Sequence, residues 1–166
     1  MRPEEILKIR FENVRFDPVG NARFGYIHNP EGKTRRAKRN LPMTARVREV
    51  LMRRYEAAGK PRWAWAFARG EGERASYDSV KCHHRRLMYK LPKNARWRLY
   101  DLRHTNLTRL GESGADPFSI QILAGHGSIL TSQRYVHPTP ERIESAVERL
   151  EAYNLRQAED SIPETA

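Results

Sequence analysis

The fold of this chain is decided by the stretch Leu99-Tyr-Asp-Leu-Arg-His-Thr-Asn-Leu-Thr-Arg-Leu110, together with Leu123-Ala-Gly-His126 and Gln133-Arg-Tyr-Val-His-Pro138. Within the first segment, Leu102, Leu107 and Leu110 lie within one or two turns of one another. This spacing predicts an amphipathic helix with Arg103 beside its apolar stripe. Gly111 and Gly114 indicate the end of that helix.

Two more short helices are expected after it. Asp116-Pro117 is typical of a helix start, with the aspartate as N-cap and the proline in the first turn, and Gly125 is typical of a helix end. His126 is therefore expected at a helix end, where its ring can lean into a cleft. The third helix begins after Ser128 and presents Tyr135 just before a proline break. An arginine, a histidine and a tyrosine are thus predicted on three successive helices.

The composition indicates a single globular domain with a polyanionic partner. The chain has 166 residues, 39% of them hydrophobic and 31% charged, which is enough for a hydrophobic core. Its formal net charge of +11 and its pI near 10.2 favour binding to nucleic acid. The single cysteine, Cys82, excludes an internal disulfide framework and suits a reducing compartment. No apolar run approaches the length of a membrane span and no signal-peptide pattern is present, so we expect a cytoplasmic protein with no membrane partner.

The three segments resemble the catalytic domain of tyrosine recombinases, the phage-type integrase family. In that family an arginine lies in a His-x-x-Arg-His-Thr-like helix, followed by Leu-x-Gly-His and by a tyrosine nine residues after that histidine. Arg103, His126 and Tyr135 match these positions. The first histidine of the pattern is replaced by Tyr100, whose phenol can donate a hydrogen bond to a phosphate but carries protons poorly near neutral pH. The resemblance implies a mainly α fold with a small antiparallel β-sheet (α+β).

The start of the chain resembles a further part of the same motif. Residues 2–11 are expected to form a helix with Pro3 at its first position and with Ile6 and Leu7 facing inward. The family opens such a helix with Gly-x-Arg-x-x-Glu-(Leu/Ile)-Leu, and Arg2 matches its first catalytic arginine. We therefore expect a catalytic domain over residues 1–154 that lacks its first helices and the N-terminal DNA-clamping domain. The polar residues 155–166 are expected to form a disordered tail.

Strands are predicted over residues 14–17 and 22–28, with a further extended segment at 33–43. The family carries a three-stranded sheet here, and a lysine at a hairpin tip reaches the active site. Lys33 matches this lysine, with Arg35 and Lys38 as alternatives because the pattern alone does not set the register of a hairpin. The groups interpreted as DNA contacts are Arg35, Arg36, Lys38, Arg39 and His104. The alternative for this basic run is a solvated face that contributes only solubility.

Two longer helices are expected in the middle of the chain. The first begins after the N-cap Thr44 and ends at Gly59, and its inward residues are Val47, Val50, Leu51 and Tyr55. The second runs from Ser76 to Lys90, with inward residues Val80, Leu87 and Met88. Between them, residues 61–67 favour a short strand or a packed extended segment, and residues 69–74 favour a loop.

Cys82, His83 and His84 form a cluster of residue types that bind metals. Adjacent histidines on a helix point about 100° apart, and no second ligand pair with zinc spacing follows them. These groups are therefore interpreted as surface or DNA-facing residues, and no metal site is predicted.

A last helix is expected over residues 138–153. Its apolar stripe consists of Ile143, Ala146, Val147 and Leu150. In the resembled family such a helix often docks on a neighbouring protomer and couples the sites of a homo-tetramer assembled on DNA. The alternative is packing of the stripe against the chain's own core.

The resemblance implies the chemistry of DNA strand exchange. Tyr135 is expected to be the nucleophile, because a 3′-phosphotyrosyl link preserves the bond energy needed to rejoin the strand. Arg103 and Arg2 are expected to bind the non-bridging phosphate oxygens. His126 is expected to bond the phosphate or relay the tyrosine proton, and Lys33 to protonate the leaving oxygen. This scheme requires no metal or cofactor.

The expected function is that of a bacterial or phage-encoded site-specific recombinase or integrase that acts on double-stranded DNA. A catalytically impaired DNA-binding remnant of an integrase is one alternative, and a type IB topoisomerase-like enzyme is another. The compact spacing from Leu123-Ala-Gly-His126 to Tyr135 favours the integrase branch.

Overall fold

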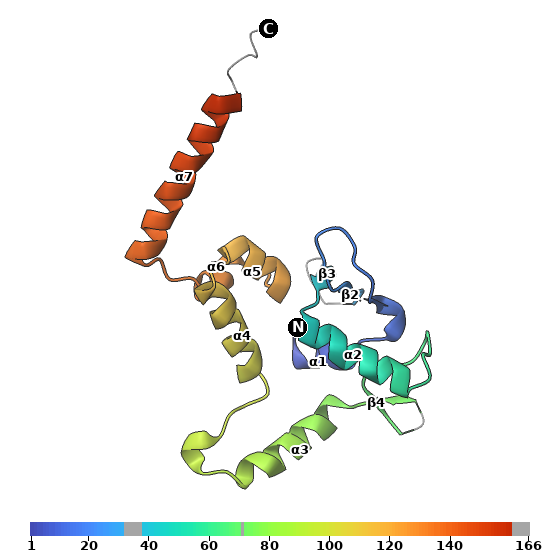
Figure 1. The fold of residues 1–166 in the computed structure, drawn as a ribbon. Coiled ribbons are helices and arrows are strands. Elements are labelled where there is room, and N and C mark those ends of the chain that lie inside the picture. Colours follow the sequence, from blue (N-terminus) through green and yellow to red (C-terminus); the bar gives the residue numbers. More distant parts are fainter. Residues whose placement is uncertain (32–37, 71, 161–166) are drawn as a thin grey trace.

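The computed structural model describes residues 1–31, 38–70 and 72–160 (Figure 1). Helices dominate, and the strands in the described ranges form two small antiparallel sheets, so the predicted α+β class is confirmed. The first part of the chain contains α1 (Pro3–Leu7), η1 (Phe11–Asn13), β1 (Val14–Arg15), β2 (Tyr26–Asn29), β3 (Arg39–Pro42) and α2 (Ala45–Ala57). The second part contains β4 (Ala68–Arg69), β5 (Glu73–Arg74), α3 (Tyr77–Tyr89), η3 (Lys93–Ala95), α4 (Asp101–Glu112), α5 (Pro117–Ala124), α6 (Ile129–Gln133) and α7 (Pro140–Asp160).

The larger sheet has the strand order β1-β2-β3 and carries the first hydrophobic core. Ile27 pairs with Val14 on one side and with Leu41 on the other, and all three side chains are buried on the same face. Because side chains alternate along a strand, Arg39 shares this inner face with Leu41. The first residue of β3, the buried Arg39, therefore reaches α5, where it bonds the Leu123 carbonyl.

Helix α2 starts where the sequence predicts, since the Thr44 hydroxyl accepts a hydrogen bond from the Val47 backbone N–H at 3.3 Å. Leu51 packs into the first core, but the prediction that Val47 faces inward is wrong. Helix α1 is shorter than expected, and Ile6 is exposed rather than buried. Ile9, which follows α1, fills the core instead.

The second core joins α4, α5 and the segment after α6. Leu107 of α4 packs against Ile120 and Ala124 of α5. Arg103 lies one turn before Leu107 on the same buried face, so the prediction that it lies beside the apolar stripe is wrong. Leu102, which was assigned to the stripe, is exposed. Leu123 of α5 also packs against the first core, so the two cores meet beside Arg103.

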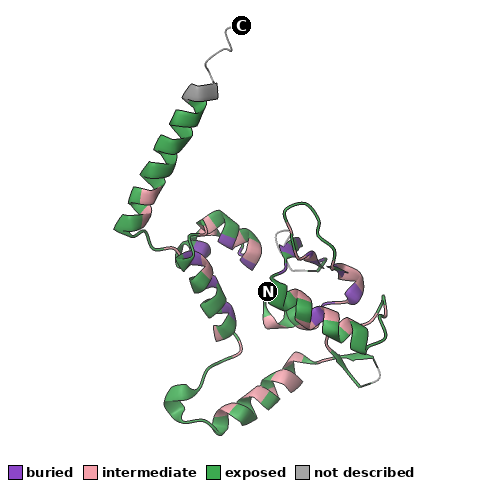
Figure 2. Cartoon of the chain, in the orientation of Figure 1, coloured by how far each residue is buried: buried purple, intermediate pink, exposed green. Residues whose placement is uncertain are grey.

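Helices α3 and α7 lie at the periphery of the described chain (Figures 1 and 2). None of the residues of α3 is fully buried, and Leu87, predicted to face inward, is exposed. Helix α7 points away from the other elements, and Ile143, Val147 and Leu150 are each about 60% exposed. In the described part of the chain, neither hydrophobic core includes a residue of this stripe, which contradicts the alternative that the stripe packs against the chain's own core.

Two boundaries differ from the sequence prediction. Helix α7 continues to Asp160, beyond the domain end expected at residue 154. Where a loop was expected over residues 69–74, β4 and β5 pair antiparallel, and Trp65 forms an isolated β-bridge with Arg10 before them. Within the described ranges, none of the helices has the length and apolar character needed to cross a lipid bilayer.

Candidate active site

Arg103 is held at the carboxyl end of α5. Its side chain projects from the buried face of α4, and its Nη2 donates a hydrogen bond to the Ala124 carbonyl at 2.7 Å. Its Nη1 is buried and has no hydrogen-bond partner among the described residues. Burial lowers the pKa of Arg103, although a guanidinium remains charged at any physiological pH. A buried cation with an unsatisfied donor indicates a site built to accept an anion.

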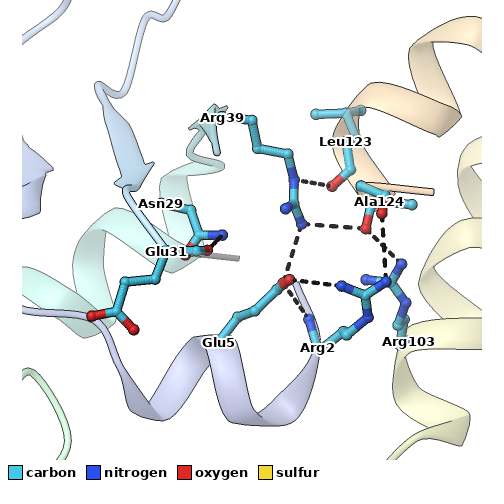
Figure 3. Close-up of polar contacts among 9 residues, drawn as sticks. Arg2, Glu5, Asn29, Glu31, Arg39, Arg103, Leu123 and Ala124 are labelled. Carbon is cyan, nitrogen blue, oxygen red and sulfur yellow. Dashed lines mark hydrogen bonds and ion pairs between the residues drawn. The ribbon is translucent and has the colours of Figure 1, made fainter. Parts of the chain in front are cut away.

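Arg2 reaches the same helix end from α1. Its Nη2 lies 3.4 Å from the Gly125 carbonyl, and its Nη1 lies 3.2 Å from Glu5 Oε1. The Glu5 carboxylate also accepts a hydrogen bond from the Arg2 backbone N–H at 2.7 Å. Arg2 and Arg103 therefore approach two consecutive carbonyl groups at the end of α5 (Figure 3).

Arg39 completes this cluster from β3. Its Nε donates to the Leu123 carbonyl at 3.1 Å, and its Nη2 contacts the Glu5 carboxylate at 3.1 Å (Figure 3). Only 4% of its side chain is exposed. The interpretation of Arg39 as a DNA contact does not fit this burial, and we assign it to holding α5 against α1 and the sheet.

The Glu5 carboxylate is the negative charge that the three arginines share. Burial by itself raises the pKa of Glu5, but the hydrogen bond from the Arg2 backbone and the charge of Arg39 outweigh burial and leave the pKa lowered. Arg2 and Arg39 bind this carboxylate and Arg103 only senses its charge, so the cluster keeps a positive excess that can attract a phosphate.

Gly125 is required at the end of α5 for two reasons. Its φ of +69° is in the left-handed region, which side chains with a Cβ rarely adopt. In addition, a Cβ on Gly125 would lie 2.7 Å from Arg39 Nη1. The glycine before the histidine therefore permits both the helix end and the close approach of Arg39.

His126 follows directly and is buried, with 8% of its surface exposed. Its Nδ1 lies 2.9 Å from the Ser132 hydroxyl, and Ser132 is fully buried. Burial, reinforced by the charges of Arg103 and Arg2, lowers the pKa of His126 to about 4. The ring is therefore neutral at pH 7, and with Nδ1 accepting from Ser132 we assign its proton to Nε2. Such a ring can donate a hydrogen bond but is a weak base.

Tyr135 lies two residues beyond the end of α6, rather than on that helix as expected. Its ring is stacked on His126, with centroids 6.1 Å apart and an interplanar angle of 15°. Burial raises the pKa of its phenol. A close approach to α4 positions its backbone, because a Cβ on Gly111 would lie 1.8 Å from the Tyr135 carbonyl oxygen. Gly111 is thus a packing residue as well as part of a helix end.

Arg142 fixes the chain just after Tyr135. Its Nη2 donates to the Gly111 carbonyl at 2.7 Å and also to the Glu112 carbonyl. These are carbonyl groups at the end of α4, which lack partners within the helix. The first turn of α7 is thereby anchored to α4 even though the rest of α7 points away.

Tyr100 and His104 lie on the exposed side of the site. Their rings are 5.0 Å apart in an edge-to-face arrangement, and His104 Nδ1 lies 2.7 Å from Tyr135 Oη. His104, interpreted from the sequence as a DNA contact, thus contacts the expected nucleophile. Lys38 is exposed and directly precedes β3, whereas Lys33, Arg35 and Arg36 lie outside the described residues.

The structure brings Arg2, Arg103, His126 and Tyr135 to one site, around the end of α5. Sequence reasoning missed Glu5, Ser132 and the packing role of Gly111. Glu5 had a usable signal, because a glutamate three residues after an N-cap often closes a capping box. Ser132 had none, since a serine in a short helix is ordinarily exposed.

Residues 1–142 match the phage integrase family. The chain is 32% identical over 129 residues to tyrosine recombinase XerC of Rhodospirillum centenum, an alignment that covers 75% of this chain and 37% of that protein. The fold is similar to that of the Tn1549 transposon integrase in complex with circular intermediate DNA, with a TM-score of 0.66, 24% identity and coverage of 90% of this chain and 56% of that one.

Two further solved structures share the fold. The XerA recombinase matches with a TM-score of 0.63 and 19% identity over 89% of this chain and 51% of that one. The XerH site-specific recombinase, bound to its difH substrate in a pre-cleavage complex, matches with a TM-score of 0.58 and 21% identity over 89% of this chain and 41% of that one. The chain therefore spans between about a third and little more than half of the length of these relatives.

Proposed function

The chain belongs to the phage integrase family, and from that premise we propose that it is the catalytic part of a site-specific recombinase that cleaves and rejoins double-stranded DNA through a 3′-phosphotyrosyl intermediate. The observation that carries this proposal is the buried guanidinium of Arg103, whose unsatisfied Nη1 lies in the same site as the Tyr135 phenol. A phosphodiester is the anion that the Arg103 guanidinium would bind and that the Tyr135 hydroxyl would attack.

The arginine cluster supplies charge stabilisation in this scheme. Arg103 and Arg2 bind the non-bridging oxygens of the scissile phosphate, where negative charge grows in the pentacoordinate transition state. His126, neutral with its proton on Nε2, donates a further hydrogen bond to the same group. The Tyr100 phenol lies at the rim, where it can donate to a phosphate oxygen.

The covalent step exchanges one ester for another. Tyr135 Oη forms a bond to phosphorus and loses its proton, while the bond from phosphorus to the 5′-oxygen breaks and that oxygen gains a proton. Lys33 is proposed as the donor of the second proton. Rejoining is the reverse reaction, in which a 5′-hydroxyl displaces the tyrosine.

Trapping of the covalent intermediate tests the proposal. The probe is a library of nicked duplexes with a randomised core, because a nick lets the short 5′ product diffuse away and prevents rejoining. We expect an SDS-resistant protein–DNA adduct with the full chain and none with Tyr135→Phe, which keeps the ring and removes only the hydroxyl. DNA binding without an adduct would favour the DNA-binding remnant, and relaxation of supercoiled plasmid without strand exchange would favour a topoisomerase.

We also propose that the chain forms a homo-oligomer, a tetramer, on DNA through α7. The support is the apolar stripe of Ile143, Val147 and Leu150, which no described element of the chain covers. Stripes of this kind are ordinarily buried against another surface. Val147→Asp should reduce the mass of the protein–DNA complex in analytical ultracentrifugation, and the control Glu148→Gln, on an exposed neighbouring position, should not.

A further inference from the structure

The Tyr135 phenol has a partner that its role as a nucleophile does not itself require. Tyr135 Oη and His104 Nδ1 are 2.7 Å apart, within the range over which a proton is transferred directly. We assign the His104 tautomer with its proton on Nε2, so that Nδ1 accepts from the phenol and the contact is O–H···N. Because burial raises the pKa of Tyr135, the phenol is protonated at neutral pH and must lose its proton when it attacks.

The other groups near the phenol are poor acceptors of that proton. His126 stacks face to face with the Tyr135 ring, its Nδ1 is bonded to Ser132, and its pKa is lowered to about 4. Tyr100 is itself a phenol, and Arg103 is a cation. In the described part of the chain, His104 is the base whose hydrogen bond ends on Tyr135 Oη.

The helix geometry explains why His104 can hold this position. Tyr100 is the N-cap residue of α4 and His104 lies four residues later, so the two side chains lie on the same face. The edge of one ring meets the other at 5.0 Å, with an interplanar angle of 67°. His104 is thus supported by Tyr100 on one side and bonded to Tyr135 on the other, and its ring remains exposed enough to exchange a proton with solvent.

We propose that His104 is a catalytic residue that accepts the phenolic proton of Tyr135 as Oη attacks phosphorus, and returns it when the tyrosine is displaced. This assignment rests on the proposed function. The O–H bond of Tyr135 breaks and an N–H bond forms at His104 Nδ1. The departing 5′-oxygen takes its proton from Lys33, the donor proposed above. Imidazole suits this step because it exchanges protons near neutral pH.

The groups that face this pair determine its pH response. On α4 they are Asp101, whose carboxylate is bound to Arg98, together with Tyr100 and Arg103. From the other elements they are His126 and Arg134. Because the pKa of His126 is lowered to about 4, its ring stays neutral at neutral pH and adds no charge change there.

A variant that keeps the hydrogen bond but cannot take the proton tests the role. In His104→Asn the amide oxygen can accept from Tyr135 Oη near the place of Nδ1. We expect adduct formation on the nicked duplex that the wild-type chain cleaves to slow by about 10²-fold, the usual contribution of a general base. Replacement of Tyr135 by 3,5-difluorotyrosine, a more acidic phenol, should restore most of that loss. An equal loss with both phenols, or no loss at all, would overturn the proposal.

A measurement without DNA separates this inference from the proposed function. With 3-fluorotyrosine at position 135, the ¹⁹F shift should show a pH-dependent step that disappears in His104→Asn. The control His83→Asn, which changes an exposed histidine on α3, should leave it intact. If the wild-type chain forms no adduct but this pH-dependent step is present and requires His104, the proton acceptor of Tyr135 is His104 and the proposed recombinase function is contradicted. A pH-dependent step that persists in His104→Asn refutes the claim that His104 accepts the Tyr135 proton.

Discussion

Gly111→Ala should displace the nucleophile without unfolding the protein. The added Cβ would lie 1.8 Å from the Tyr135 carbonyl oxygen and 2.8 Å from its carbonyl carbon. Because real Cβ contacts essentially never fall below 3.0 Å, the Tyr135 backbone must retreat by about 1.2 Å. A misplacement of about 1 Å in an active site costs on the order of 10² in rate, and we expect that loss in adduct formation.

The stability effect of the same change has two opposing parts. Alanine in a helix interior is favoured over glycine by about 1 kcal/mol, whereas overpacking costs about 1–3 kcal/mol. The free energy of unfolding should therefore fall by no more than about 2 kcal/mol, and the thermal transition should remain cooperative. Loss of activity would then reflect a local displacement rather than unfolding.

Amide hydrogen exchange measures the displacement of the segment that carries Tyr135, and adduct formation measures its effect on activity. Exchange should accelerate over residues 129–139, which carry α6 and Tyr135, and stay unchanged in α2. Gly127→Ala is the matched control, because a Cβ there meets nothing within 4 Å. Wild-type adduct formation in Gly111→Ala, or unchanged exchange around Tyr135, would refute the claim that this contact positions the nucleophile.

Three further predictions concern the arginine cluster and its histidine. Gly125→Ala should lower the free energy of unfolding by about 1–3 kcal/mol in urea titration, because the left-handed φ is strained and the Cβ meets Arg39; an unchanged midpoint would contradict this. Glu5→Gln should lower stability at pH 7 by about 1–3 kcal/mol and flatten its acid dependence, since a carboxyl whose folded pKa is lowered stabilises above its unfolded pKa and loses that contribution as pH falls. His126 has a folded pKa of about 4, below the 6.5 of an unperturbed histidine, so the unfolded chain binds the proton first. Stability should then fall by about 3 kcal/mol from pH 6.5 to pH 4, and His126→Gln should lack this slope in the same titration.

The places of the site residues relative to the helix ends could be predicted, because capping residues and glycines near them in the sequence determine where the helices start and stop. Asp116 caps α5 with hydrogen bonds to two backbone N–H groups, and Gly125 ends it, as the sequence indicates. These short-range signals place His126 at a helix end without any knowledge of the fold. Tyr135 lies just beyond α6 rather than on it, because the chain turns there to dock its carbonyl against Gly111.

The identity of the buried positions could not be predicted from periodicity alone. A stripe of leucines on α4 suggested that Leu102 is buried and Arg103 is not, and the reverse is true. The reason lies in the tertiary structure. Burial of an arginine requires hydrogen-bond acceptors, and for Arg103 the Ala124 carbonyl oxygen on another helix supplies one. Arg39 is a similar case, because a basic residue in a basic run looks exposed until strand pairing shows it on the inner face with Leu41.

The way the arginines are held explains how the site can keep its charge. Were each guanidinium paired with its own carboxylate, the positive charge available to a phosphate would be cancelled. Here the carbonyl groups of Leu123, Ala124 and Gly125, at the negative end of the α5 dipole, accept hydrogen bonds from all three guanidinium groups. Among the described residues, Glu5 is the carboxylate that Arg2 and Arg39 share. Carbonyl dipoles orient the guanidinium groups without neutralising them, so the positive charge is already in place before an anion arrives. That arrangement favours a transition state that gains negative charge over a ground state that carries less.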